Sequence, residues 1–305
     1  MIELGSGDLE ALCADPAIGE RLGATEGERQ AAVRQFLLRA AAGLAAAVAA
    51  AIFLYQSGWV KSAFFAFVII AVGAGFAAFL PLNAARDRLK HPVLAVLGRR
   101  AGLDYFPSDF EPPALASACD LLFGRMGFSS EAYSDLFNGK DEEGHGLAVY
   151  EACLKRRVGK STYVVFSGQI YAVQRRPGAV GETVIVPDRN LLNFWTPASE
   201  LERVPIEGDP YFEDRFEVYS THPIEARDLL FDSAFRARLL ELREQGRVWL
   251  YAGPEEALVA VSGGEDRFEP GSMLSYRPGE DRVKLMFDDF CASLALLGEL
   301  KAKLG

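Results

Sequence analysis

The chain has 305 residues, of which 50% are apolar, and a net charge of -10 at pH 7. Residues 1–100 contain 10 Lys and Arg against 8 Asp and Glu, whereas residues 101–305 contain 22 against 34. An acidic C-terminal part of this kind repels phosphate, which excludes nucleic acid as a partner and argues against broad docking onto anionic lipid. The length allows two ordinary domains, or one domain and a membrane segment.

The cysteine pattern argues against a disulfide framework and against a zinc site. Cys13, Cys119, Cys153 and Cys291 are far apart, and none forms a CxxC pair. We therefore expect free thiols in a reducing compartment, and neither a metal nor another cofactor. The N-terminus is acidic and lacks the basic start and short apolar run of a cleaved signal peptide, so we expect the apolar segment that follows to be retained.

Two apolar stretches, residues 36–55 and 63–82, are each long enough to cross a bilayer as a helix. Arg39 is the only charged residue in them and lies near one end, from which its side chain can reach the headgroups. Because only residues 56–62 separate the stretches, they predict an antiparallel transmembrane hairpin with Trp59 at the interface. The alternative is a hairpin buried inside a soluble protein, which would need apolar cover on every helix face.

Basic residues predict the orientation of this hairpin. Three arginines precede or open the first helix and five Lys and Arg follow the second, while Lys61 alone lies in the connection. This asymmetry places both termini in the cytoplasm. Small residues recur in both helices, and we expect Gly43, Gly73 and Gly75 to allow close packing within the hairpin or between the hairpins of a homo-oligomer.

The remaining chain predicts an α+β domain behind a helical extension. We expect residues 83–113 to be a helix, interrupted near Pro92, and a proline-rich linker. A short helix at 115–126 and a loop-rich region at 128–146 follow. Alternation of polar and apolar residues on either side of a short Gly-containing turn predicts an antiparallel hairpin at 147–157 and 161–173. Four further short strands are expected at 182–187, 216–220, 248–253 and 256–263, and the six segments together predict an antiparallel sheet. Helical periodicity predicts two helices that cover this sheet, at 223–245 and 282–303.

These predictions combine into one organisation of the chain. Four parts are expected: an N-terminal cytoplasmic helical segment at 1–35, a transmembrane hairpin at 36–82, an extension and linker at 83–113, and a cytoplasmic antiparallel-sheet domain with packed helices at 114–305.

His145 is the histidine with the strongest claim to a functional site. It follows Asp141 and Glu143, and imidazole together with carboxylates suits zinc, manganese or a hydrolytic base. The competing interpretation is a solvated acidic loop, because the flanking glycines are turn residues and no second ligand group occurs at a fixed spacing. The sequence also lacks a nucleophile elbow and a phosphate-binding loop. We therefore assign no catalytic, cofactor-binding or metal-binding residue.

A basic cluster lies at the tip of the first predicted hairpin. It consists of Lys155, Arg156, Arg157 and Lys160. Charges at such a position ordinarily protect a strand edge or a loop. The functional alternative is contact with lipid headgroups, since the domain is tethered close to a bilayer.

The segment FEDRFEVYSTHPIEARDLL, from Phe212 to Leu230, resembles the core motif of a bacterial membrane protein family called domain of unknown function 3137, FExxFxVYSxDPxEARYLLTP. The resemblance implies two N-terminal membrane helices, an upstream hairpin at 163–173 and a C-terminal helix, and it lends no activity. The chain departs from the motif at His222, at Asp228 and at 231–232. The matching residues include Phe212, Phe216, Tyr219, Ser220, Pro223, Glu225, Ala226 and Arg227.

The residue types in this motif indicate a strand-to-helix junction that defines the fold. Phe216 and its alternating neighbours point into the core from a strand, Pro223 and Glu225 begin a helix, and Arg227 is placed to pair with an acid or a strand end. With no catalytic set in view, we expect a membrane-anchored cytoplasmic interaction or scaffold module of the bacterial inner membrane. Its expected partners are the lipid bilayer, further copies of the chain and an unknown protein. The alternatives are a membrane-face hydrolase that uses acidic residues with His145, and a lipid-headgroup sensor.

Overall fold

The structure is a computed structural model that describes residues 6–124, 127–188, 198, 201–263 and 267–305. Two compact units divide the described chain. One contains residues 97–267 and 289–305, and the other contains residues 6–96 and 268–288. The unit boundary falls within helix α3 (Val60–Ala101) and within helix α8 (Gly279–Leu304), so each of these helices contributes to both units.

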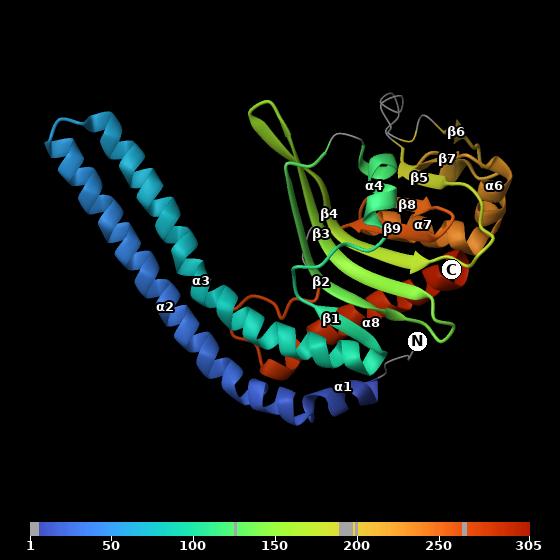
Figure 1. The fold of residues 1–305 in the computed structure, drawn as a ribbon. Helices are drawn as coiled ribbons and strands as arrows, with labels where there is room; N and C mark the ends of the chain where they lie inside the picture. The colour runs from blue at the N-terminus through green and yellow to red at the C-terminus, as the bar shows by residue number, and fades with distance from the viewer. Residues whose placement is uncertain (1–5, 125–126, 189–197, 199–200, 264–266) are drawn as a thin grey trace. The chain divides into compact units, whose positions relative to one another are not determined.

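The second unit is built on a pair of long helices. Helix α1 (Ser6–Cys13) precedes α2 (Pro16–Gln56). Pro16 is the first residue of α2, where the backbone N–H that proline lacks would have no partner within the helix. Helix α2 has 41 residues and α3 has 42, and Figure 1 shows them side by side and antiparallel, joined by a short turn. The predicted N-terminal pair of apolar helices is therefore confirmed.

Helix α3 continues through Pro92, so the predicted interruption there is wrong. A proline inside a helix removes one hydrogen bond and costs about 3 kcal/mol. Leu89, Val93 and Leu94 on either side of it are 2% exposed or less. Burial of several large apolar side chains, each contributing about 1.5–3 kcal/mol, outweighs that cost.

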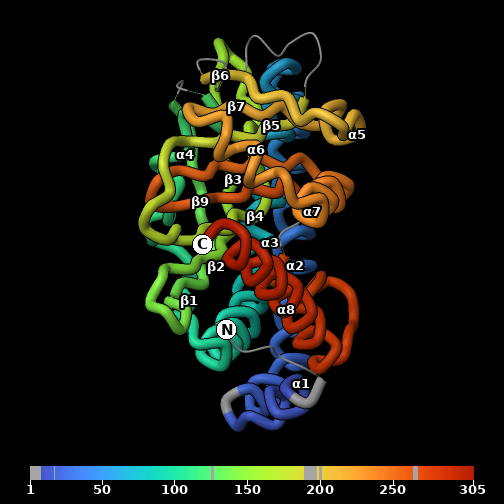
Figure 2. The backbone as a smooth tube through the Cα atoms, turned by 90° about the vertical axis from the view of Figure 1, so that its right-hand side faces the viewer, coloured from blue at the N-terminus to red at the C-terminus, as the bar shows by residue number. Residues whose placement is uncertain are grey.

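The first unit contains a nine-stranded antiparallel sheet, which confirms the α+β prediction. Its strand order is β1-β2-β3-β4-β9-β8-β5-β7-β6. Figure 2 shows β6 and β1 at opposite ends of the sheet. The strands are β1 (Leu103–Phe106), β2 (Ser130–Lys140), β3 (Gly146–Val158), β4 (Ser161–Gln174), β5 (Thr183–Pro187), β6 (Glu202–Arg203), β7 (Phe216–Ser220), β8 (Val248–Ala252) and β9 (Glu256–Ser262). The six predicted strands correspond to β3, β4, β5, β7, β8 and β9.

Three strands were not predicted. Strand β2 lies in the region that was expected to be loop-rich. It was missed because a bulge between Ser134 and Phe137, where Asp135 adopts φ 55°, breaks its alternation. Strand β1 is four residues long and lies beside the proline-rich linker, and β6 has two residues. Segments that are this short carry no recognisable period.

Helices cover both faces of the sheet. Helix α4 (Leu115–Phe123) lies on one face, where it packs into a core that includes Phe166 and Trp249. The C-terminal half of α8 lies on the opposite face, where the Phe290 ring is 4.7 Å from that of Phe137. The helix predicted at 223–245 is two helices, α6 (Pro223–Phe231) and α7 (Ser233–Gln245). Asp232 separates them because it is extended and accepts the backbone N–H groups at the start of α7, as an N-cap does.

Candidate functional site

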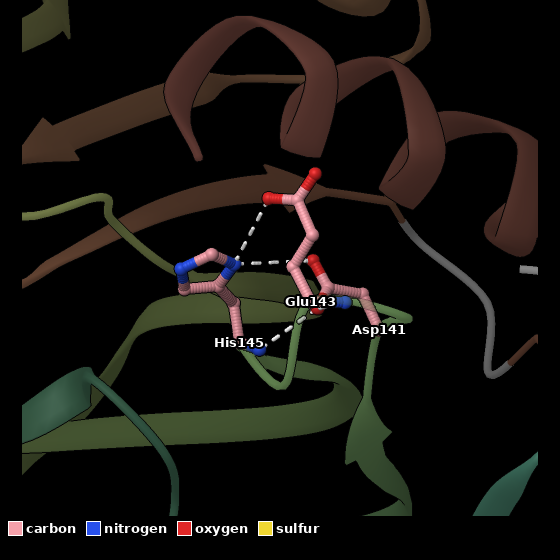
Figure 3. Close-up of side chains that lie close together, drawn as sticks. All are labelled: Asp141, Glu143 and His145. Atoms are coloured by element: carbon pink, nitrogen blue, oxygen red, sulfur yellow. Dashed lines mark hydrogen bonds and ion pairs between the residues drawn. The ribbon is translucent and has the colours of Figure 1, made fainter.

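The turn between β2 and β3 brings Asp141, Glu143 and His145 together (Figure 3). Asp141 Oδ1 accepts the backbone N–H groups of Glu143 at 2.9 Å and of His145 at 2.8 Å. The imidazole Nδ1 of His145 lies 3.4 Å from Asp141 Oδ2 and 3.6 Å from Glu143 Oε2. The acidic loop predicted from the sequence thus folds into a turn in which one histidine faces two carboxylates.

Lys301, in the last turn of α8, completes this cluster. Its Nζ lies 2.7 Å from Asp141 Oδ2, and the Asp141 side chain is fully buried. The hydrogen bond from Lys301 and the two backbone N–H groups lower the pKa of Asp141 below its usual range. Glu143 pairs with a different cation, because Arg176 Nη2 lies 3.4 Å from its carboxylate. The two acids are therefore balanced by two cations within the domain.

The ligand atoms of Asp141, Glu143 and His145 lie within 4.8 Å of one another, which is close enough for a shared metal ion. The Lys301 ammonium, however, occupies the position beside Asp141 Oδ2 that a divalent cation would need. A metal would have to displace a cation already bonded there, so the donor set does not fit a resident metal. What the cluster does is hold the C-terminal helix against the β2–β3 turn.

A hydrolytic role for His145 needs a substrate cavity and a partner for its second nitrogen. A neighbouring cavity of about 230 Å³ is lined by Gly146, Gln174 and Glu256 among others, and His145 is not part of its lining. Gln174 fixes this edge, because its Oε1 accepts the N–H of Gly146 at 2.9 Å. The structure therefore places His145 beside two acids, as a base would require, but outside the lining of this cavity.

The basic cluster on the β3–β4 hairpin does not act as one group. Arg156 points toward α4, where its Nη2 donates to the carbonyl of Phe123 at 2.9 Å and its guanidinium lies 5.5 Å from the Phe128 ring centroid. Lys155 is half-buried, and Arg157 and Lys160 are exposed. Arg156 thus stabilises the C-terminal end of a helix, as a cation there does, and is not available to headgroups.

The family motif forms a packed junction. Phe212 in α5 (Pro210–Glu213) and Phe216 in β7 are buried, with ring centroids 5.0 Å apart. Tyr219 donates to Glu217 at 2.7 Å. Ser220 is fully buried, donates to the carbonyl of Glu182 at 2.9 Å and accepts the N–H of the next helix's N-cap residue. These contacts join a strand to the helix after it.

The helix that follows is held through Glu225 and not through Arg227. Pro223 is the first residue of α6, Ala226 is fully buried, and Glu225 Oε1 accepts from Arg175 Nη2 at 3.3 Å. The same guanidinium donates to carbonyls of the β8–β9 turn and of the end of α8. Arg227 is exposed and forms no ion pair with any residue that the structure describes, so its expected pairing is not observed.

Small residues form the seam between the two long apolar helices. A Cβ on Gly43 would lie 2.1 Å from the Cβ of Ala74, so only glycine allows the observed approach. Gly73 and Gly75 have open space at the corresponding position. The predicted role of Gly43 in close helix packing therefore has a contact within the chain. For Gly73 and Gly75 the role in association between chains stays a prediction.

One further hydrogen bond crosses this seam. Pro81 has no N–H, so the carbonyl four residues earlier, that of Ala77, lacks its partner within α3. Arg39 Nη1 donates to this carbonyl at 3.1 Å. The one charged residue of the two apolar stretches thus satisfies the carbonyl that the proline leaves unpaired, which lowers the cost of both in a medium without water.

Large apolar side chains cover the outside of the same helices. Phe76 is 77% exposed and Ile69 is 69% exposed, and only 6% and 11% of the most apolar windows of α2 and α3 are buried. A core helix of a soluble protein would be mostly buried. The exposed apolar surface identifies the chain as membrane-associated.

Residues 164–302 match the family model DUF3137, described as a protein of unknown function. The resemblance predicted from the motif is confirmed for this part of the chain. The DUF3137 region includes β7 and α6 together with most of the sheet and of α8. No curated protein matches the chain. Among solved structures, the chain is similar to the crystal structure of the mycobacterial trehalose monomycolate transport factor A, TtfA, with 12% identity, 67% of this chain and 94% of that chain covered, and a TM-score of 0.33.

Two residues of the site were missed from sequence alone. Lys301 and Arg175 are ordinary cations in the sequence, and each bonds to groups that are distant along the chain. Arg175 has a weak local signal, since it lies two residues after the strand predicted at 161–173. Lys301 has none, because its partner Asp141 lies on another element and no helical spacing connects them.

Proposed function

We propose that the chain is a multi-pass protein of the bacterial inner membrane with a non-enzymatic cytoplasmic module. In this proposal the α2–α3 hairpin crosses the bilayer twice, and both termini and the sheet domain lie in the cytoplasm. The domain serves as an interaction or scaffold module that holds a protein partner at the membrane face.

The observation that supports membrane insertion is the exposure of large apolar side chains along the predicted spans. Fifteen such residues of segments 36–55 and 63–82 lie on the surface of the structure. Burial of one large apolar side chain contributes about 1.5–3 kcal/mol, so hydration of the whole set would cost on the order of 20 kcal/mol or more. A bilayer removes that cost, and the polar seam groups of the hairpin are already satisfied.

The engagement of the ionisable groups supports a non-enzymatic module. Asp141 is bonded to Lys301, and Glu225 is bonded to Arg175. The first pair connects α8 to the β2–β3 turn, and the second connects α6 to the residue that follows β4, so both pairs stabilise the fold. A hydrolase would instead present such groups to a substrate cavity.

Cysteine labelling in cells tests the topology. In a chain whose four native cysteines are replaced by alanine, Gly58→Cys marks the α2–α3 turn and Arg176→Cys marks the domain, where the Arg176 side chain is 63% exposed. A maleimide that cannot cross the inner membrane should label only the first in intact cells and both after lysis. Labelling of the domain in intact cells would contradict the proposed orientation.

The non-enzymatic part has its own test. His145→Gln removes the one candidate base while keeping a polar side chain of similar size. We expect this variant to complement a deletion strain fully. Loss of complementation, with normal protein levels in the membrane, would favour the hydrolase alternative, because it would show that the imidazole itself is required.

A further inference from the structure

The tip of the β3–β4 hairpin projects beyond the sheet as a two-stranded ribbon (Figure 1). Pairing with β2 ends at Lys155, and pairing with β9 ends at Gly168. Beyond these points β3 and β4 pair only with each other, up to Val158 opposite Ser161 at the turn. We call residues 156–166 the arm.

The arm carries positive charge and lies in a stretch of the sequence that contains no acidic residue. Residues 152–181 contain six Lys and Arg and no Asp or Glu, in a domain whose overall balance is strongly acidic. Arg157 and Lys160 are exposed and form no ion pair with a residue that the structure describes. Their charge is therefore available to an external anion.

Exposed apolar side chains lie among these cations. Val158 is 56% exposed, Tyr163 is 58% exposed and Val164 is 60% exposed. Val164 pairs with Lys155, and Arg157 lies two residues further along the same strand, so Val164 and the exposed Arg157 share one face of the ribbon. Aromatic and aliphatic groups interleaved with cations are the composition of a segment that enters the interfacial layer of an anionic membrane.

The arm is also fixed to the rest of its domain. Arg156, at its base, donates to the carbonyl groups of Phe123 at 2.9 Å and Gly124 at 3.3 Å, and so ties the ribbon to α4. A ribbon held in this way loses little conformational freedom when it binds.

We propose that the arm docks on the anionic surface of the bilayer in which the chain is anchored. The inference rests on the proposed membrane anchor, which supplies a high local concentration of lipid and lets a small contact suffice. A long polyanion such as nucleic acid would extend from the arm onto the acidic domain and be repelled there. A bilayer can contact the tip of the arm alone and need not approach the acidic remainder of the domain.

Depth-dependent quenching in proteoliposomes tests the docking. The full-length chain, with its native cysteines replaced by alanine, carries an environment-sensitive fluorophore on Tyr163→Cys, and brominated phosphatidylcholine is the quencher. A matched label on Tyr211→Cys, at a tyrosine that is 52% exposed on α5, reports on a surface away from the arm. In vesicles with about one third phosphatidylglycerol we expect quenching at position 163 at least twofold stronger than at position 211, and lost at high salt.

Charge reversal identifies the groups responsible. Arg157→Glu with Lys160→Glu should abolish the quenching at position 163, whereas Arg176→Glu, in the same acid-free stretch but outside the arm, should leave it unchanged. Equal quenching at positions 163 and 211 in anionic vesicles would overturn the proposal and leave an acidic protein as the partner. In that case co-flotation of the chain with the vesicles would still confirm the anchor, whereas a chain that fails to float contradicts the anchor itself.

Discussion

The sheet domain buries its large apolar side chains, whereas the two long apolar helices expose theirs. In the sheet domain, Phe137, Phe166 and Phe290 are at most 1% exposed. In the apolar stretches of α2 and α3, Ala47, Ala63 and Ala78 are buried and Gly43 closely approaches Ala74, while Phe76 is 77% exposed. Side-chain size is thus sorted inward in one region and outward in the other.

This inversion is expected if different media stabilise the two regions, as in the proposed membrane hairpin. In water, removal of large apolar groups from the solvent drives packing. In lipid the tails are as apolar as leucine, so helices associate through close approach of small residues and through hydrogen bonds such as that from Arg39 to Ala77.

Removal of a large buried ring should have the greatest effect in the sheet domain. Phe290→Ala removes a fully buried side chain that packs on Phe137, and we expect the free energy of unfolding to fall by about 3–5 kcal/mol. Phe231→Ala is the control, because this side chain is 86% exposed, and it should change stability by less than about 0.5 kcal/mol. Denaturant unfolding followed by tryptophan fluorescence measures both. Equal losses would show that the core is not where the structure has it.

A charge on the outward face of α3 should be costly only if that face meets lipid. Ile69→Arg places a guanidinium near the middle of the predicted span, where insertion costs about 2.5–3.5 kcal/mol. The fraction of the chain in the membrane pellet should fall several-fold, and Ile69→Leu should leave it unchanged. An arginine that is tolerated at this exposed position would show that the face is hydrated.

The Asp141–Lys301 pair should contribute to stability in a way that depends on pH. The lowered pKa of Asp141 means that its carboxylate is favoured in the folded state, so the contribution is complete above the unfolded value of about 3.9 and is lost as the pH falls below it. Asp141→Asn should reduce the free energy of unfolding by about 1.5–3 kcal/mol at neutral pH. The difference from the unmodified chain should shrink progressively below about pH 4.

Asp288→Asn provides the comparison for this pair. Asp288 also bonds to a lysine, but both side chains are more than half exposed. Exposed pairs contribute about 1 kcal/mol at most. A pH profile of Asp141→Asn that parallels the unmodified chain at every pH would show that the buried carboxylate is not stabilised by its neighbours.

The seam of the hairpin should tolerate a side chain at one glycine and not at another. Gly43→Val would force a branched side chain against Ala74 and should destabilise the hairpin by about 1–3 kcal/mol. Gly73→Val meets open space within the chain. Thermal unfolding in detergent should therefore separate the two variants. If Gly73→Val instead reduces crosslinking between chains, the predicted lateral association gains support.

Local patterns were sufficient to predict much of the fold. The hairpin at 147–173 was predicted from its alternation of polar and apolar residues, and four further strands were predicted as short segments. The two apolar helices were predicted because each is long and almost free of charge. Strand β2 was missed because Asp135 interrupts its alternation at a bulge. The split between α6 and α7 was missed because an exposed Asp232 can cap a helix or continue one, and the choice depends on packing.

The candidate site could be predicted only in part, because one of its residues is distant in the sequence. Asp141, Glu143 and His145 are close in sequence, and their turn brings them together as neighbours. Lys301 decides what that cluster can do, yet it lies far along the chain on another element. Tertiary pairing of this kind has no period and no fixed spacing, so the sequence left the metal-site and solvated-loop interpretations open.

Membrane fractionation of the full-length chain under alkaline carbonate tests the central claim most directly. Carbonate removes proteins that bind the bilayer surface by charge and leaves those whose apolar helices lie within it. We expect the chain to stay in the pellet after high-speed centrifugation and to dissolve only when detergent is added. A chain that remains in the supernatant would show that the exposed faces of α2 and α3 are not covered by lipid, and would contradict the proposed membrane hairpin.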